Sequence, residues 1–213
     1  PVQAPGETFS FTGKVTCTDA SLVKYGWSVD EGEKVWTDAA YYEVALTAAG
    51  VHTLTLDVFY GDEDKGLAGT VPFLVTSPDV YVIDPALNPG HVPVYPYSTP
   101  EGAAIDLQEA VQCARSGTTV HVGPGVHGVS RPLELVGAVR LVSDEGRDKT
   151  VIHQTATGGL ENRCVHLNDP GALLDGFALT GASGDPYGIA ACIDAGGGRI
   201  LNCIATNNVT GAK

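Results

Sequence analysis

A spacing of 26 residues recurs in the second half of the chain. It separates Leu167 from Ile193 and Phe177 from Cys203, and all four residues lie in short apolar segments bounded by Gly, Asp and Asn turns. A repeat of this length is typical of a solenoid, in which each coil covers the apolar row of the coil before it. The spacing therefore predicts stacked coils, with strands at 118–122, 139–142, 150–152, 164–167, 173–179, 189–193 and 200–205.

An amphipathic helix is predicted just before the first of these strands. Thr99 supplies a capping hydroxyl, and Pro100 suits the first helical position. Apolar residues then recur at helical spacing from Leu107 to Ala114, and Gly117 ends the pattern. Because the open end of a solenoid exposes strand edges, we expect this helix to cap the first coil.

Several segments of this region carry a family resemblance. Residues 105–111 and 117–127 resemble the opening of the pectate-lyase-like proteins, and residues 131–135 and 139–142 resemble the next two strands of that family's first coil. The resemblance extends from about residue 80 to residue 213, and it implies the first coils of a right-handed parallel β-helix. The family includes pectate lyases, pectin methylesterases, polygalacturonases and extracellular proteins of no assigned activity, so the fold does not select a reaction.

The first part of the chain has a different pattern. Between residues 8 and 76, short segments alternate apolar and polar side chains, with turn residues between them. In the clearest segment, Leu54, Leu56 and Val58 face one side while their polar neighbours face the other. This alternation predicts a sandwich of antiparallel sheets with one buried and one solvated face.

Two stretches of this first module resemble PKD domains. Residues 27–32 resemble the family's Trp-Asp-Phe-Gly-Asp-Gly turn, and residues 50–58 resemble its Gly-Thr-Tyr-Thr-Val-Thr-Leu-Thr-Val strand. The chain departs from the turn pattern at Ser28 and Asp30, where the family has aspartate and glycine. The resemblance implies an Ig-like sandwich that acts as a spacer or adhesion module. We expect Trp27 to fill its core rather than to form an exposed sugar platform.

A proline-rich segment separates the two modules. Proline suppresses regular hydrogen-bonded structure and favours extended linkers, although a short strand is expected at 80–83. The predicted organisation is all-β, with an Ig-like sandwich at 1–78, a linker at 79–98 and the beginning of a parallel β-helix at 99–213. The prolines concerned are Pro78, Pro85, Pro89, Pro93 and Pro96.

The charge and the apolar runs restrict the partners. Lys and Arg number 12 against 25 for Asp and Glu, giving a net charge of −13, so nucleic acid and anionic membranes are poor partners. No apolar run approaches the roughly 20 residues of a bilayer span, and no charged start followed by an apolar stretch indicates a signal peptide. A chain that begins at Pro1 without methionine indicates a mature or excised segment. Its architecture favours an extracellular or cell-surface location, and we expect further coils beyond Lys213.

No residue of the repeat region is assigned a catalytic or carbohydrate-binding role. Lyases that resemble this family hold calcium with clustered carboxylates beside a base, and hydrolases use paired acids. The repeat region lacks an Asp-Asp pair, Gly-His-Gly and Arg-x-Lys. The remaining titratable residues are His121, His127, His153 and His166, of which the last two are expected to stack on one face, and Asp169, Asp175, Asp185 and Asp194, which turn chemistry explains.

No metal or cofactor is predicted either. The acidic run Asp62-Glu63-Asp64 supplies too few oxygen ligands for calcium, and we expect a solvated loop there. The cysteines form no C-x-x-C pair and are expected to be small buried hydrophobes, although Cys192 and Cys203 could form a disulfide across stacked strands. The cysteines are Cys17, Cys113, Cys164, Cys192 and Cys203.

Asparagines cluster near the end of the chain. Asn202, Asn207 and Asn208 resemble the stacked asparagine ladders of β-helix turns, and Asn208-Val209-Thr210 is also a glycosylation sequon.

Three functional hypotheses remain. The first is a secreted or surface β-helix protein that binds or adheres to polysaccharide or to a cell-surface glycan, without catalysis in these residues. The alternative is the amino-terminal part of a polysaccharide lyase or glycoside hydrolase that acts on acidic polysaccharides. A third, a purely structural stalk, is not separated from the first by sequence.

Overall fold

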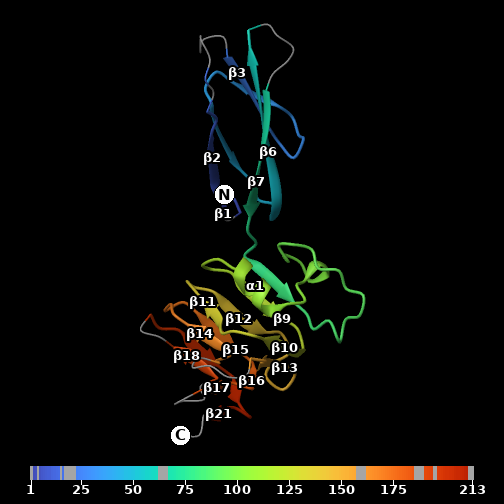
Figure 1. The fold of residues 1–213 in the computed structure, drawn as a ribbon, viewed down its shortest axis with the longest axis vertical. Helices are drawn as coiled ribbons and strands as arrows, with labels where there is room; N and C mark the ends of the chain where they lie inside the picture. Colours follow the sequence, from blue (N-terminus) through green and yellow to red (C-terminus); the bar gives the residue numbers. More distant parts are fainter. Residues whose placement is uncertain are drawn as a thin grey trace. The chain divides into compact units, whose positions relative to one another are not determined.

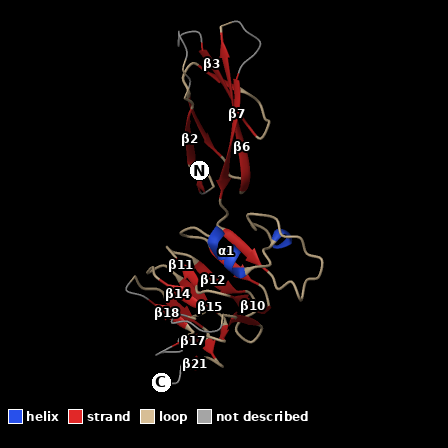
Figure 2. Cartoon of the chain, viewed as in Figure 1, coloured by secondary structure: helices blue, strands red, loops and turns tan. Residues whose placement is uncertain are grey.

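The computed structural model is all-β with parallel sheets (Figures 1 and 2). It describes residues 2–3, 5–14, 16, 23–61, 67–156, 162–184, 190–193 and 196–210. The chain divides into two compact units, Pro1–Thr76 and Ser77–Lys213. Within the described ranges, no helix is long and apolar enough to cross a lipid bilayer.

The first unit consists of two sheets. One is five-stranded, in the order β1-β7-β6-β3-β4, and the other pairs β2 with β5. All pairings are antiparallel except that of β1 with β7. The strands are β1 (Val2–Gln3), β2 (Thr8–Thr12), β3 (Val23–Val29), β4 (Val35–Thr37), β5 (Tyr41–Ala45), β6 (Gly50–Tyr60) and β7 (Leu67–Val75).

The core of the first unit lies between these sheets. Phe9 from the smaller sheet packs edge-on against Phe73 of the larger one, with ring centroids 4.7 Å apart. Trp27 is only 2% exposed and stacks on Tyr42 at 5.6 Å, while its indole nitrogen donates to the Thr37 hydroxyl at 2.9 Å. The expectation that Trp27 fills the core is confirmed.

The second unit contains three parallel sheets that grow together. Their strand orders are β19-β15-β12-β9-β8, β10-β13-β16-β20 and β11-β14-β18, and a further pair joins β17 to β21. Each circuit of the chain adds one strand to each of the three sheets in turn. The elements are β8 (Asp79–Val82), η2 (Pro100–Gly102), α1 (Leu107–Cys113), β9 (Thr119–Val122), β10 (Gly125–Val129), β11 (Leu133–Leu135), β12 (Arg140–Ser143), β13 (Thr150–Gln154), β14 (Val165–Leu167), β15 (Leu173–Asp175), β16 (Ala178–Thr180), β17 (Ser183–Gly184), β18 (Ala191–Ile193), β19 (Arg199–Leu201), β20 (Ile204–Ala205) and β21 (Val209–Thr210).

The repeat read from the sequence corresponds to a strand register. Leu167 of β14 pairs with Ile193 of β18, and the Phe177 amide donates to the Cys203 sulfur, 26 residues further on. Inward-facing apolar residues of successive circuits stack in rows, as Leu141 and Leu174 do, and both of these side chains are fully buried. Burial therefore accumulates circuit by circuit, because each row is covered by the next.

The helix begins later than the sequence indicates. Thr99 caps the short 3-10 helix η2, accepting from the Gly102 amide, while α1 starts only after Asp106. The Asp106 carboxylate accepts from the first amides of α1, and Ala104 bridges to β8, so the chain is extended between the two helices. The helix contacts β8, β9, β10 and β11, and thereby covers the first strands of the three sheets, as Figure 1 shows.

The proline-rich segment lies within the second unit. Its first residues form β8, which pairs in parallel with β9, and the Tyr81 amide donates to the Tyr97 carbonyl at 2.9 Å. Val80, Val82 and Tyr97 are buried in the core of this unit. The short strand expected at 80–83 is thus confirmed as β8, at the edge of the sheet, and the prolines of the segment 79–98 lie after it.

Candidate functional site

The outer face of the sheet β8-β9-β12-β15 carries polar and aromatic side chains in register. In β8 and β9, valines point inward and are buried, so the alternating residues point outward. Register pairs Asp79 with Thr119 and Tyr81 with His121 across the two strands. Regular alternation on a parallel sheet therefore places these groups in two adjacent rows on a solvated surface.

His121 lies at the centre of this surface. Its Nε2 atom is 3.1 Å from Oδ1 of Asp79, and its Nδ1 atom is 3.2 Å from Oδ1 of Asp144. The Tyr81 ring stacks on the imidazole, with ring centroids 5.0 Å apart and planes inclined by 16°. We call Asp79, Tyr81, His121 and Asp144 the His121 cluster.

The chemistry of the His121 cluster follows from its acceptors. An ionised carboxylate only accepts hydrogen bonds, so an imidazolium can donate to both Asp79 and Asp144, whereas a neutral imidazole can donate to one of them. Both ring nitrogens of His121 are thus engaged within the chain. The Asp79 and Asp144 side chains are 43% and 45% exposed, so their carboxylates remain accessible to hydroxyl groups of a ligand.

The polar surface continues onto the next strands. Asp175 of β15 is in register with Val142 of β12. Its carboxylate accepts a hydrogen bond from the side-chain amide of Asn202 at 2.8 Å. The exposed Arg140 lies on β12 in the neighbouring row. Carboxylates predominate along this face, with hydrogen-bonding groups at successive strand spacings.

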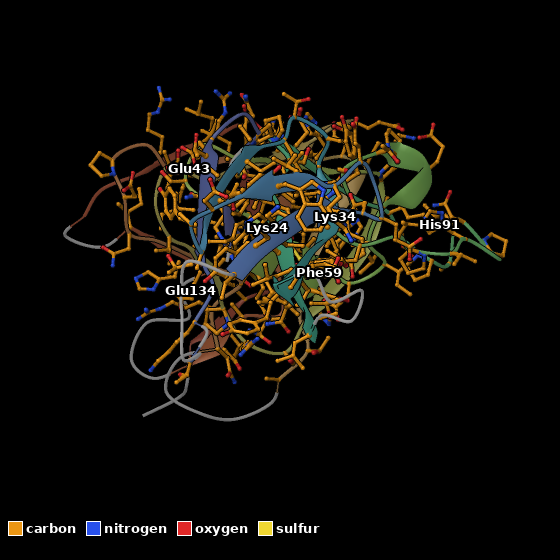
Figure 3. The ribbon with its side chains drawn as sticks, turned by 90° about the horizontal axis from the view of Figure 1, so that it is seen from above. Lys24, Lys34, Glu43, Phe59, His91 and Glu134 are labelled. Carbon is orange, nitrogen blue, oxygen red and sulfur yellow. The ribbon has the colours of Figure 1, made fainter. Side chains whose placement is uncertain are left out.

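A second polar pair lies on the sheet β11-β14-β18. Nδ1 of His166 is 2.8 Å from Oε2 of Glu134, whose position is labelled in Figure 3. The backbone of Cys192 is in register with His166, but the Cys192 side chain lies outside the described residues. Beside this pair, a hollow of about 400 Å³ is lined by Gln108, Val111, Gln112, Arg131, Pro132, Leu133 and Glu134.

The other histidines of the repeat region are not brought together. His127 is buried, with Nε2 2.9 Å from the Gly123 carbonyl, and burial lowers its pKa despite that hydrogen bond. His153 is exposed on β13, where its Nδ1 atom lies 3.0 Å from the Thr180 hydroxyl. The expected stacking of His153 with His166 is wrong, because β13 and β14 belong to different sheets.

The aspartates divide between turns and the sheet face. Asp169 accepts from the Gly171 amide at 2.7 Å, as turn chemistry predicts, whereas Asp175 ends a strand and binds Asn202. Among the described residues, no three His, Cys, Asp or Glu side chains gather into a group that could hold a metal ion. The run Asp62-Glu63-Asp64 and the residues Asp185 and Asp194 lie outside the described residues.

The cysteines described by the structure are free thiols. Cys164 is buried, and Cys113 and Cys203 are half-buried. The disulfide considered between Cys192 and Cys203 is therefore not formed, and burial raises the pKa of the Cys203 thiol. Cys17 lies outside the described residues.

The three asparagines near the end of the chain serve turns and strand ends. Asn202 and Asn207 adopt positive φ values of 50° and 53°, a conformation that asparagine tolerates. Asn208 bridges two backbone groups of the preceding circuit: its Oδ1 accepts from the Ala182 amide at 2.9 Å, and its Nδ2 donates to the Leu179 carbonyl at 3.0 Å.

Sequence reasoning missed three members of the His121 cluster, Asp79, Tyr81 and Asp144. Asp79 and Tyr81 fall at the start of the predicted linker, where the sequence predicts a short strand at 80–83 but not the strand that pairs with it, and Asp144 follows the strand predicted at 139–142. The sequence does contain a signal for this pairing. In both Asp-Val-Tyr-Val at 79–82 and Thr-Val-His-Val at 119–122, valine alternates with a polar or aromatic residue. Two matched segments of that kind indicate paired strands with the same inward face.

Comparisons with protein-family models, with curated proteins and with solved structures return no match for this chain. Its function is therefore inferred from the geometry of its own residues.

Proposed function

We propose that this chain is a polysaccharide-binding protein built from a PKD-like, Ig-like sandwich and the first coils of a right-handed parallel β-helix. The observation that carries the proposal is the His121 cluster, in which Tyr81 and His121 stack between the exposed carboxylates of Asp79 and Asp144. An exported protein with an extracellular or cell-surface ligand suits this architecture.

The sheet topology supports the β-helix. Three parallel sheets gain one strand each per circuit, and inward rows such as Leu141 and Leu174 stack in register. Crossover connections between parallel strands of one sheet are right-handed in nearly all proteins, which favours that hand for the coil. The two sheets of the first unit, packed around Trp27, support the Ig-like sandwich.

The outer face of β8 and β9 suits a sugar. A pyranose presents hydroxyl groups at its rim and C–H groups on its faces. Exposed carboxylates accept from hydroxyls, and charge-assisted hydrogen bonds of this kind are about twice as strong as neutral ones. Tyr81 is half-exposed and adds an aromatic surface with a polar hydroxyl, a combination that suits partly wet interfaces.

The charge of this face favours a neutral polysaccharide. Asp79, Asp144 and Asp175 lie along it, and a uronic-acid polymer would bring like charges close to them. Like charges placed opposite one another oppose binding, most strongly at low salt. The chain as a whole carries −13, which acts in the same direction.

The enzyme alternative also has its best support at His121. A histidine between two carboxylates is a constellation that lyases and hydrolases can use, but a general base needs a lone pair within reach of the substrate proton. In the imidazolium form, both nitrogens of His121 donate to Asp79 and Asp144, and no lone pair remains for a substrate proton. Binding without bond cleavage is thus the better reading of this geometry.

The test is affinity electrophoresis of the full chain in gels containing xylan, mixed-linkage β-glucan or galactomannan. We expect retardation by at least one neutral polymer, and a loss of about tenfold in affinity for Tyr81→Ala and Asp144→Asn. Tyr41→Ala, which removes an exposed tyrosine of the first unit, is the matched control and should bind as the parent does.

Two results would overturn the proposal. Unretarded migration in every neutral polymer would remove the binding function from this face. New reducing ends or unsaturated products, abolished by His121→Gln, would instead establish the lyase or hydrolase. Far-ultraviolet circular dichroism confirms that each variant is folded.

A further inference from the structure

The first unit carries an exposed aromatic cluster on its larger sheet. Trp36 stands on the edge strand β4 and is 53% exposed, an unusual position for so large an apolar side chain. Its ring lies 5.3 Å from that of Phe59 on β6, with the planes inclined by 58°. Lys34, just before β4, completes the group with Asp57. We call Lys34, Trp36, Asp57 and Phe59 the aromatic shelf.

The aromatic shelf is held in place from below and from the side. A Cβ atom added at Gly26 would lie 2.6 Å from Cδ of Lys34 and 3.1 Å from Cζ3 of Trp36, so both side chains cross directly over the Gly26 backbone. The Lys34 ammonium lies 2.5 Å from Oδ2 of Asp57. It is also 5.5 Å from the Trp36 ring centroid and 5.9 Å from that of Phe59.

These contacts order the aromatic shelf before any ligand arrives. An ion pair and two cation–π contacts fix the long Lys34 side chain, which in turn supports Trp36. Less side-chain entropy is then lost on binding, which is the main benefit of preorganisation.

Most of the neighbouring side chains on the same face of the sheet are small. Gly26 is in register with Asp57, which pairs with Ala68, and Ser28 is in register with Thr55, which pairs with Thr70. Small side chains therefore occupy these neighbouring positions on β3, β6 and β7, beside the two rings and the lysines. Two rings and their flanking residues are too small for a stable protein interface, which buries at least about 1,000 Å².

The aromatic shelf is itself neutral, because Lys34 and Asp57 balance each other, and an exposed lysine lies beside it. Lys24 is exposed and in register with Phe59, so their side chains emerge side by side on this face. Figure 3 labels Lys24, Lys34 and Phe59 on these strands. Asp57 balances Lys34, and Lys24 then leaves one excess positive charge, in a chain whose net charge is −13.

We propose that the aromatic shelf binds a carboxylated pyranose, such as a uronic-acid residue of an acidic polysaccharide. The sugar's C–H face stacks on Trp36, and its carboxylate pairs with Lys24. The Lys34–Asp57 ion pair offers a donor and an acceptor to the adjacent hydroxyls. This site lies in the first unit and prefers the opposite ligand charge, so it is independent of the His121 cluster.

The test uses the full chain and trigalacturonate as the probe, with xylotriose as the neutral comparison. Trp27 is buried and Trp36 exposed, and they are the chain's 2 tryptophans, so ligand-dependent fluorescence reports on Trp36. We expect trigalacturonate to change the emission and xylotriose to leave it unchanged. Calorimetry should show a loss of about tenfold in affinity for Trp36→Ala.

Three further variants separate the contributions. Lys24→Gln should weaken binding severalfold and reduce its salt dependence, because the removed charge is exposed. Gly26→Ala should weaken binding by displacing Lys34 and Trp36 while the strand stays folded. Lys14→Gln removes an exposed lysine outside the aromatic shelf and should bind as the parent does. In Trp36→Ala, emission from Trp27 verifies the fold of the first unit.

The proposal is overturned if trigalacturonate binds Trp36→Ala and Lys24→Gln as well as it binds the parent chain, or if it fails to bind the parent. An equal change in Trp36 emission with xylotriose would remove the charge preference and so the proposed ligand class, whereas xylotriose binding that Tyr81→Ala abolishes belongs to the His121 cluster. Self-association that Trp36→Ala abolishes, without sugar binding, would assign the shelf to a protein contact instead. Tyr81→Ala should leave trigalacturonate binding unchanged, so failure at one site is distinguishable from failure at the other.

Discussion

The His52 imidazole links the Asp30 turn to the segment before β6. Its Nδ1 atom lies 2.6 Å from Oδ2 of Asp30, and its Nε2 atom lies 2.9 Å from the Ala48 carbonyl oxygen. The Thr53 amide donates to the other Asp30 oxygen at 2.8 Å. Asp30 has a positive φ of 50°, so these contacts hold a conformation that most residues avoid.

This arrangement shifts two pKa values. Burial alone would lower the pKa of His52, but the hydrogen bonds to Asp30 and the Ala48 carbonyl, with the Asp30 charge, raise it above 6.5. Burial alone would raise the pKa of Asp30, but the hydrogen bonds from His52 and the Thr53 amide, with the His52 charge, lower it below 3.8. Each ionised group thus favours the ionised form of the other.

The stability of the first unit should therefore depend on pH. The His52 contribution is complete below pH 6.5 and is lost as pH rises through the raised pKa. The Asp30 contribution is complete above pH 3.8 and is lost as pH falls through the lowered pKa. Asp30→Asn, which tolerates the positive φ, should consequently destabilise this unit more at pH 5.5 than at pH 8.5.

Urea unfolding followed by tryptophan fluorescence measures this effect, because both tryptophans lie in the first unit. Asp38→Asn, at an exposed aspartate of the same unit, is the matched control and should show no such pH dependence. Equal destabilisation by Asp30→Asn at the two pH values would show that the ion pair contributes nothing.

Packing in the second unit gives a second prediction. Leu174 is fully buried and lies in register between Leu141 and Ile200. Leu174→Ala should lower the free energy of unfolding by about 2–5 kcal/mol, because it removes buried surface and leaves a cavity. Val136→Ala, at an exposed position, should change it by less than about 0.5 kcal/mol. Urea unfolding followed by circular dichroism measures the free energy of unfolding of both variants. Similar losses in the two would mean that the buried row of Leu141, Leu174 and Ile200 does not stabilise the stacked circuits.

Much of the second unit could be predicted because its information is local and repeated. Apolar residues recur at the circuit length, so the pairing of Leu167 with Ile193 follows from sequence spacing alone. The extent of α1 did not follow, since Thr99 and Asp106 are both good capping residues and only the bridge from Ala104 to Val82 separates the two helices.

The candidate sites could not be predicted because they depend on register between distant segments. Asp79 and His121 are 42 residues apart, and they meet only because β8 adds to the edge of β9. Trp36 and Phe59 likewise meet across β3, over the backbone of Gly26. Sequence patterns specify which face a residue occupies more readily than which strand lies beside it.

The thiol of Cys164 gives a third prediction. It is fully buried, and burial raises its pKa from 9.0 to about 11, although backbone hydrogen bonds at Gln154 and Thr180 lower it. At pH 8 its thiolate fraction is then roughly a hundredfold lower than that of a free cysteine, and the thiolate is the reactive form. Iodoacetamide should modify Cys164 far more slowly in the folded chain than in urea. Peptide mapping by mass spectrometry checks this, and equal rates in the two conditions would contradict the burial.

Asn208 gives a fourth prediction, since its side-chain amide satisfies two backbone groups. Asn208→Ala would leave the Ala182 amide and the Leu179 carbonyl without these partners, so we expect a loss of about 1–3 kcal/mol in stability. Thr206→Ala, at an exposed neighbour, is the control.

The same two hydrogen bonds bear on the Asn208 sequon. A glycan on Nδ2 leaves one N–H but places the sugar next to the preceding circuit, where Nδ2 lies 3.0 Å from the Leu179 carbonyl oxygen, so the folded chain should be a poor acceptor even in a host that glycosylates. Intact-mass analysis of chain secreted from such a host, before and after glycosidase treatment, measures the occupancy. Full occupancy of the folded, secreted chain would contradict this prediction.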